Sequence, residues 1–281
     1  MSQRITVEEI IAKKKTGEKI TVLTAYDYAF ALLIDKSGID IVLVGDSLAN
    51  VGLGLDSTLD VGMTEMIHHA KAVNRGVKYA LVVGDMPYEA YQIDVFKAVE
   101  NAKRFVDEAG CDAIKLEWFD QCLEVAEMVI AQGIPVMGHV GLTPQTAEKL
   151  GGFKVQGKDA ESAKKIIENA KALEAKGCFC VVLECVPFSL AEIITKELNI
   201  PTIGIGAGVY CDGQVLVTND ILGLYDRHSP KFVKKYVDLS EAALKAITQF
   251  RDEVKSCKFP DIEHSYSMSI EEINRVRELE K

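Results

Sequence analysis

Charged or hydroxyl-bearing residues follow five successive apolar runs, at the point where each run ends. Asp46 and Ser47 end the run IDIVLVGDS, and Asp85 ends the run YALVVGD. The runs AIKLEW, PVMGHVG and CFCVVLE carry the other candidates, which are Lys115, Glu117, His139 and Glu184. Each residue alone could be a solvated strand end or a helix cap. Their repetition predicts a shared site, because the carboxyl ends of parallel strands meet at one rim of a barrel.

The residue types indicate which chemistry this rim could perform. Asp46 and Asp85, with Glu117 nearby, are hard oxygen donors, and Mg2+ binds one or two carboxylates and completes its shell with water and substrate. No paired His or Cys spacing favours a softer metal. Lys115 and Glu117 are two residues apart, so their side chains share one face of a strand, where a plain structural ion pair is the alternative. Glu184, flanked by apolar residues, is the candidate general base.

The elements that must position these residues alternate between short apolar runs and helical patterns. Most runs are continuously apolar, as expected for parallel strands covered on both sides. The expected strands are 21–25, 39–45, 79–84, 113–116, 135–138, 179–183, 201–205 and, weakly, 221–224. Asp94, Asp120 and Asp159 open helical patterns between them. Eight such strands over about 250 residues predict an α/β fold, a (β/α)8 barrel, and a doubly wound open sheet is the competing arrangement.

We expect one domain over residues 1–281, with a short N-terminal helix at 6–15 and a helical tail from about residue 270. No Pro- or Ser-rich linker interrupts the chain. Two insertions, 47–62 and 143–158, follow strand ends, where loops build the active site of a barrel.

Composition narrows the classes of partner. The formal net charge of −10 argues against a nucleic-acid binder, which needs basic surface to neutralise phosphates. No apolar run reaches the roughly 18 residues of a membrane span, so we expect no membrane partner. Seven scattered cysteines without paired CxxC motifs predict buried thiols in a reducing cytoplasm.

Several motifs, in order along the chain, closely resemble ketopantoate hydroxymethyltransferase, also called 3-methyl-2-oxobutanoate hydroxymethyltransferase. The resemblance runs from about Thr21 to Tyr266. The motifs are TAYDYAFA (24–31), LVGDSL (43–48), GHVGLTPQ (138–145), GGFKVQG (151–157), LECVP (183–187), IGIGAG with DGQVLV (203–217), PKFVKKY (230–236) and FPDIEHSY (259–266). Trp118 departs from the small residue that the family pattern has after the Glu of the fourth strand.

The resemblance implies a magnesium-dependent barrel enzyme of pantothenate biosynthesis. It would transfer a one-carbon unit from 5,10-methylenetetrahydrofolate to 3-methyl-2-oxobutanoate and release 2-dehydropantoate. Family members form homodecamers, so a homo-oligomer is expected. The implied roles are metal binding for Asp46, Asp85 and Glu117, substrate binding for Asp46, Ser47, Asp85, Lys115 and His139, and proton acceptance for Glu184.

Two other classes of function stay open at this stage. One is a folate-independent barrel lyase or aldolase that acts on a 2-oxo acid, in which Lys115 could form a Schiff base. The other is a catalytically silent protein that binds an oxo acid. The sequence shows no folate-binding motif, so the distinction rests on the resemblance.

Overall fold

The structure of the protein is a computed structural model that describes residues 4–224 and 230–280. Eight parallel strands close into a barrel in the order β1 to β8, so the predicted (β/α)8 fold is confirmed and the open sheet is excluded. The strands are β1 Ile20–Thr24, β2 Ile41–Val44, β3 Leu81–Asp85, β4 Ala113–Glu117, β5 Val136–Gly141, β6 Cys180–Glu184, β7 Thr202–Ile205 and β8 Gly213–Leu216.

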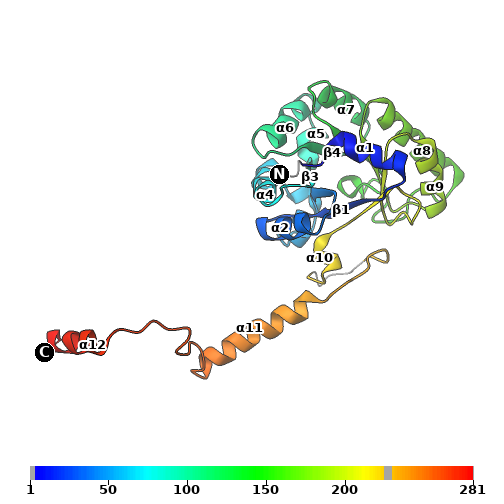
Figure 1. Ribbon diagram of the computed structural model, residues 1–281. Coiled ribbons are helices and arrows are strands. Elements are labelled where there is room, and N and C mark those ends of the chain that lie inside the picture. Colours follow the sequence, from blue (N-terminus) through cyan, green and yellow to red (C-terminus); the bar gives the residue numbers. More distant parts are fainter. Residues whose placement is uncertain (1–3, 225–229, 281) are drawn as a thin grey trace. The chain divides into compact units, whose positions relative to one another are not determined.

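Helices surround the barrel and connect its strands (Figure 1). The helices of the barrel unit are α1 Val7–Thr16, α2 Tyr28–Lys36, α3 Leu48–Val51, α4 Met63–Gly76, α5 Tyr88–Tyr91, α6 Val95–Asp107, α7 Cys122–Ile130, α8 Ala160–Ala175, α9 Phe188–Glu197 and α10 Thr218–Ile221, with short 3-10 turns η1 Thr58–Asp60 and η2 Pro144–Thr146. Helices α11 Leu239–Lys255 and α12 Ile270–Leu279 follow the barrel in the sequence. Asp94 and Asp159 accept hydrogen bonds from the first turns of α6 and α8, as predicted for N-caps. The N-cap of α7 is Gln121, one residue after the predicted Asp120.

The eighth strand was predicted at the wrong place. The expected strand at 221–224 begins on the last residue of α10, and the true strand is Gly213–Leu216. Its sequence, GQVL, lacks a continuous apolar run because the Gln214 side chain points outward and donates to Gly208 O at 2.8 Å. Gly213 is required by close packing, since a Cβ there would lie 2.5 Å from Ile20 O of β1.

The described residues form two compact units. The first contains the barrel and runs to Ile221, with 230–234 added; the second contains 222–224 and 235–280. Within the described chain, α11 and α12 bury no residue. No helix among residues 4–224 and 230–280 combines the length and apolar character needed to cross a bilayer.

The N-terminal helix α1 closes the barrel at the end where the strands begin. Its Ile10 is fully buried in a cluster with residues of the barrel strands such as Ile20, Ile41 and Leu81. Three aspartates stand just before even-numbered strands, and each accepts the N–H of a residue in the preceding strand at 2.8 Å. These pairs are Asp40 with Thr21, Asp112 with Val82, and Asp212 with Thr202.

Cations of the N-terminal segment neutralise the same three aspartates. The distances are 2.9 Å from Lys13 Nζ to Asp40 Oδ1, 3.2 Å from Arg4 Nη1 to Asp112 Oδ2, and 2.7 Å from Lys14 Nζ to Asp212 Oδ2. These three carboxylates are therefore hydrogen-bonded and paired, so they hold structure.

Truncating the side chain of Ile10 tests whether α1 seals the barrel at the end where the strands begin. Ile10→Ala should lower the free energy of unfolding by about 2–5 kcal/mol, because it leaves a cavity in the barrel interior. Urea denaturation measures the loss, and Lys15→Ala, an exposed change on the same helix, is the matched control. An Ile10→Ala protein as stable as this control would show that α1 does not seal the barrel.

Candidate active site

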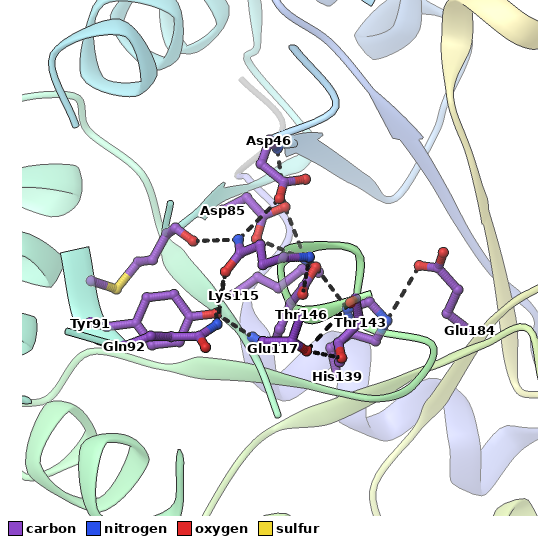
Figure 2. Close-up of polar contacts among 12 residues, drawn as sticks. Asp46, Asp85, Tyr91, Gln92, Lys115, Glu117, His139, Thr143, Thr146 and Glu184 are labelled. Carbon is purple, nitrogen blue, oxygen red and sulfur yellow. Dashed lines mark hydrogen bonds and ion pairs between the residues drawn. The ribbon is translucent and has the colours of Figure 1, made fainter. Parts of the chain in front are cut away.

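All seven residues predicted from the strand ends line one cavity of about 120 Å3 at the carboxyl end of the barrel. Figure 2 shows most of them converging from β3, β4, β5 and β6, with Asp46 from the turn after β2. The predicted residues in this cavity are Asp46, Ser47, Asp85, Lys115, Glu117, His139 and Glu184.

Lys115 and Asp85 form the closest charged contact of the cavity. They are paired across β3 and β4, and Lys115 Nζ lies 2.7 and 2.9 Å from the two carboxylate oxygens of Asp85. Burial raises the pKa of Asp85 to about 7, against the opposing effect of Lys115. Burial would lower the pKa of Lys115, but the carboxylates of Asp85, Glu117 and Asp46 raise it above its usual range. Lys115 is therefore an ammonium cation at neutral pH.

Glu117 is fully buried between two nitrogen-bearing side chains. Its Oε1 lies 3.8 Å from Lys115 Nζ and 3.7 Å from His139 Nδ1, and it has no hydrogen-bond partner among the described residues. Its Oε2 accepts the backbone N–H of Gln145 at 3.0 Å. Burial raises the pKa of Glu117 well above its usual value. A buried carboxylate oxygen without a donor indicates a site that is completed by something else.

His139 and Glu184 form a second contact on the neighbouring strands. His139 Nε2 lies 3.3 Å from Glu184 Oε2, and burial lowers the pKa of His139, so the imidazole is neutral. Glu184 ends β6 and keeps 15% of its side chain exposed, which leaves its carboxylate open to the cavity. The chain turns sharply at the next residue, Cys185, whose φ of 47° lies in the left-handed region.

Asp46 and Ser47 sit in the turn after β2. The backbone N–H of Asp46 donates to Asp85 Oδ2 at 3.2 Å, which brings the two carboxylates together. Ser47 Oγ shares a 2.8 Å hydrogen bond with Tyr26 OH. Cavity-facing polar groups thus come from the turn after β2 as well as from four strands.

Comparison with known proteins places the chain in a family. The sequence profile described as Ketopantoate hydroxymethyltransferase matches residues 4–262. The chain belongs to this family. It is 52% identical over 273 residues to the 3-methyl-2-oxobutanoate hydroxymethyltransferase of Syntrophomonas wolfei subsp. wolfei, covering 97% of this chain and 99% of the relative. It is 54% identical over 264 residues to the enzyme of the same name from Syntrophus aciditrophicus, covering 94% and 97%.

Solved structures share the fold of this family member at low sequence identity. Phosphonopyruvate hydrolase in complex with oxalate and Mg++ superposes with a TM-score of 0.58 at 12% identity, covering 98% of this chain and 96% of that one. Oxaloacetate acetylhydrolase in complex with 3,3-difluorooxalacetate gives 0.61 at 11% identity, covering 99% and 94%. These likenesses show a common barrel fold.

Gln145, the last residue of the family motif GHVGLTPQ, has no role that the sequence alone predicts. Its Nε2 donates to Asp46 Oδ2 and to Met86 O, both at 3.0 Å, and its backbone N–H donates to Glu117. Its Oε1 accepts from Tyr91 OH at 2.7 Å, and the same hydroxyl accepts the Glu117 N–H at 3.0 Å. Gln145 therefore fixes two predicted metal-binding carboxylates at once. The only sequence signal was its position in the loop that follows the fifth strand.

The donor set fits a magnesium ion held by two carboxylates. Asp46 and Asp85 are adjacent hard oxygen donors, and the combined charge of the four cavity carboxylates exceeds that of Lys115. Among residues 4–224 and 230–280, no group of three or more His, Cys, Asp or Glu side chains has the arrangement of a ready-made metal site. Two carboxylates suit Mg2+, which keeps water or substrate in its remaining coordination positions.

Removing the ammonium group tests the charge balance of the cavity. Lys115→Met should lower the free energy of unfolding by roughly 3–5 kcal/mol at about pH 8, because it leaves Asp85 buried and unpaired. The pKa of Asp85, already raised to about 7, should rise further without Lys115. A carboxyl whose pKa is higher in the folded than in the unfolded state destabilises as pH rises between the two values. The variant should therefore regain part of its stability at about pH 5.

Urea denaturation at both pH values, in buffer with a chelator, measures this effect. Lys97→Met, an exposed change on α6, is the matched control and should behave as the wild type. A Lys115→Met loss that is equal at both pH values would contradict the assignment of an ionised Asp85 beside Lys115.

Proposed function

We propose that the protein transfers a hydroxymethyl group from 5,10-methylenetetrahydrofolate to 3-methyl-2-oxobutanoate and forms 2-dehydropantoate for pantothenate biosynthesis. The observation that carries the proposal is one small cavity that holds a protonated lysine, adjacent carboxylates and a Glu–His pair. The relatives named for this reaction, similar over nearly their whole length, support it.

The residues of the cavity divide into those that bind the oxo acid and those that hold a metal. Asp46 and Asp85 would hold Mg2+, with Glu117 beside them as part of the same negative site. When bound, the ion supplies positive charge that polarises the keto oxygen of the substrate. Lys115, fixed by Asp85, adds a permanent cation that attracts the substrate carboxylate in a chain of net charge −10. Ser47, held by Tyr26, offers a hydroxyl for hydrogen bonding.

Glu184 would start the reaction by taking the proton from C3 of the oxo acid. The electrons of the broken C–H bond move onto the keto oxygen and give an enolate, which Lys115 stabilises by its charge. His139, which is neutral, would stay beside this carboxylate, with its Nε2 3.3 Å from Glu184 Oε2. The enolate carbon then forms a bond to the one-carbon unit. Two C–N bonds hold that unit on the folate. One breaks as the new C–C bond forms, and its nitrogen takes up the proton that Glu184 removed from C3. The other breaks as water supplies the hydroxyl group and gives its remaining proton to the second nitrogen, which leaves tetrahydrofolate.

The geometry disfavours a Schiff-base aldolase built on Lys115. An imine-forming lysine needs a lowered pKa, whereas the surrounding carboxylates raise the pKa of Lys115. Borohydride with the oxo acid should therefore leave no adduct on Lys115. A reduced adduct found there by mass spectrometry, with activity that survives a chelator, would support the aldolase instead.

We also propose a cytoplasmic homo-oligomer, a homodecamer as the family resemblance implies. All seven cysteines are free thiols and five are buried, as suits a reducing compartment. Helix α11 exposes Leu244, Ile247 and Phe250 along its length, and such apolar surface supports contacts with other copies. Light scattering on the purified protein measures the oligomer, and a monomer would contradict this proposal.

Replacing the proposed base isolates its step. Glu184→Gln should slow exchange of the C3 proton of 3-methyl-2-oxobutanoate in deuterated water by roughly 100-fold or more, since a positioned general base contributes about that factor. Proton NMR without folate measures the exchange. Glu168→Gln, an exposed change on α8, is the control. Exchange that persists undiminished in Glu184→Gln would assign the base elsewhere.

Neutralising one carboxylate tests the metal site. Asp46→Asn should weaken Mg2+ binding roughly tenfold or more. Even changes to residues that only hydrogen-bond to a metal ligand typically weaken metal binding by about that factor. Calorimetry of Mg2+ binding with the oxo acid present measures it, and Asp107→Asn, an exposed carboxylate at the end of α6, is the control. Unaltered Mg2+ affinity in Asp46→Asn would move the ion to another site.

A further inference from the structure

The chain leaves β6 through a strained turn directly after Glu184, the proposed base. Among the described residues, only Cys185 and Cys257 carry a side chain at a positive φ, and Cys185 follows Glu184 in the sequence. Residues other than glycine rarely adopt this left-handed conformation, because their Cβ crowds the backbone. Such a residue persists only where its surroundings hold it, and strained residues cluster at functional sites. A strained residue next to the proposed base indicates a role in placing that base.

Three backbone hydrogen bonds hold this turn from both sides. The N–H of Cys185 donates to Ile205 O of β7 at 2.8 Å, and the carbonyl of Cys185 accepts the N–H of Gln156 at 2.8 Å. The carbonyl of Glu184 accepts the N–H of Leu142, the residue after β5, at 2.9 Å. The backbone of Glu184, the last residue of β6, is therefore fixed by both neighbouring strands and by the loop that contains Gln156.

Gly141, the last residue of β5, lets this strand come close to the carbonyl of Glu184. Its φ is 98°, and a Cβ there would lie 2.3 Å from Glu184 O and 2.9 Å from Val186 Cγ1. The backbone conformation and the lack of space both require glycine at this position. An alanine at 141 would fit only if the carbonyl of Glu184 moved away, and the Cα–Cβ bond of Glu184 would move with it.

The turn leaves the carboxylate of Glu184 at one place on the rim of the cavity. Its Oε2 lies 3.3 Å from His139 Nε2, and 15% of the Glu184 side chain is exposed. A reacting group that is displaced by about 1 Å can lose roughly 100-fold in rate. Resting on the function proposed above, we propose that Gly141 and Cys185 are positioning residues for proton removal. They act by fixing the backbone from which Glu184 reaches C3 of the oxo acid.

The thiol of Cys185 is not needed for this role. Burial, and after it the charge of Glu184, raises the pKa of Cys185 to about 12, so the thiol stays protonated and does not compete as a base. Cys185 is half-buried and is not among the described residues that line the cavity around Glu184. The role therefore belongs to the backbone conformation at 185, which makes the effect of different side chains there predictable.

Two substitutions of Cys185 separate the backbone from the side chain. Glycine adopts a positive φ freely, whereas valine resists it because it is branched at Cβ. The measurement is exchange of the C3 proton of 3-methyl-2-oxobutanoate in deuterated water, at saturating oxo acid and Mg2+ and without folate. Exchange should be roughly tenfold or more faster in Cys185→Gly than in Cys185→Val. Equal rates, or a faster Cys185→Val, would overturn the role of the turn.

Gly141→Ala tests the close approach of β5, and Gly133→Ala is its matched control. Gly133 lies before β5, at the other end of the barrel, with a φ of 78° and no described atom within 4 Å of the position of a Cβ. Both changes place alanine at a positive φ, so both lower stability. Only Gly141→Ala also displaces Glu184, so it should slow the exchange roughly tenfold or more relative to Gly133→Ala. Equal exchange in the two variants would overturn the role of Gly141.

Binding measurements distinguish positioning from a general loss of structure. Asp46, Asp85 and Lys115 come from β3, β4 and the turn after β2, away from the altered backbone. In Gly141→Ala and Cys185→Val, the KM for the oxo acid and the Mg2+ affinity measured by calorimetry should therefore stay within about twofold of the wild-type values while the exchange kcat falls. Mg2+ affinity that falls as much as the exchange rate would overturn the proposal. If Gly141→Ala does not fold, the two Cys185 variants decide alone.

The same exchange reaction separates this proposal from the function on which it rests. Exchange that is absent in the wild type, or undiminished in Glu184→Gln, would overturn the proposed function. Exchange that depends on Glu184, but is as fast in Gly141→Ala as in Gly133→Ala and equal in the two Cys185 variants, would overturn only the positioning roles.

Discussion

Four carboxylates and one ammonium group share the buried carboxyl end of the barrel, and this imbalance of charge governs the arrangement around them. Lys115 alone cannot balance Asp46, Asp85, Glu117 and Glu184. Burial keeps the neighbouring imidazole neutral, so it adds no positive charge. Backbone N–H groups and a buried amide therefore donate to these carboxylates and hold them a short distance apart. Such an excess of buried negative charge favours the binding of a cation.

The parallel register of the strands turns distant residues into neighbours. Asp85 stands opposite Lys115, and Glu117 stands opposite His139, so each contact needs only adjacent strands. Aspartates also stand at the opposite end of the barrel, but there they stabilise the fold. They accept hydrogen bonds from strand N–H groups and form ion pairs with cations of the N-terminal segment. A carboxylate just before a strand thus stabilises the fold, whereas a carboxylate at the end of a strand lines the cavity.

Strand ends could be predicted because burial on both faces leaves a continuous apolar run that stops where the cavity begins. Asp85 and Glu184 could be predicted as site residues for that reason, because each ends such a run. The strand Gly213–Leu216 is hidden, since close approach to the first strand requires glycine and one of its side chains faces out. The roles of Gln145 and Tyr91 could not be predicted either. Both residues lie in helical turns of three or four residues, which are too short for a sequence pattern to show where a side chain points. Their role depends on tertiary contacts that no local pattern encodes.

Helix α1, which closes the barrel at the end where the strands begin, has a consequence for the order of folding. Lys14 reaches Asp212, a residue 198 positions further along the chain. During synthesis, the first helix therefore emerges long before its last partner exists, and its apolar face has no complete barrel to enter. Contacts so distant in sequence form late, since the closure of a long loop precedes the stabilisation they bring. We therefore expect the N-terminal helix to dock only after the eighth strand has paired with the first. In a ribosome-bound fragment that lacks the eighth strand, this helix would remain undocked.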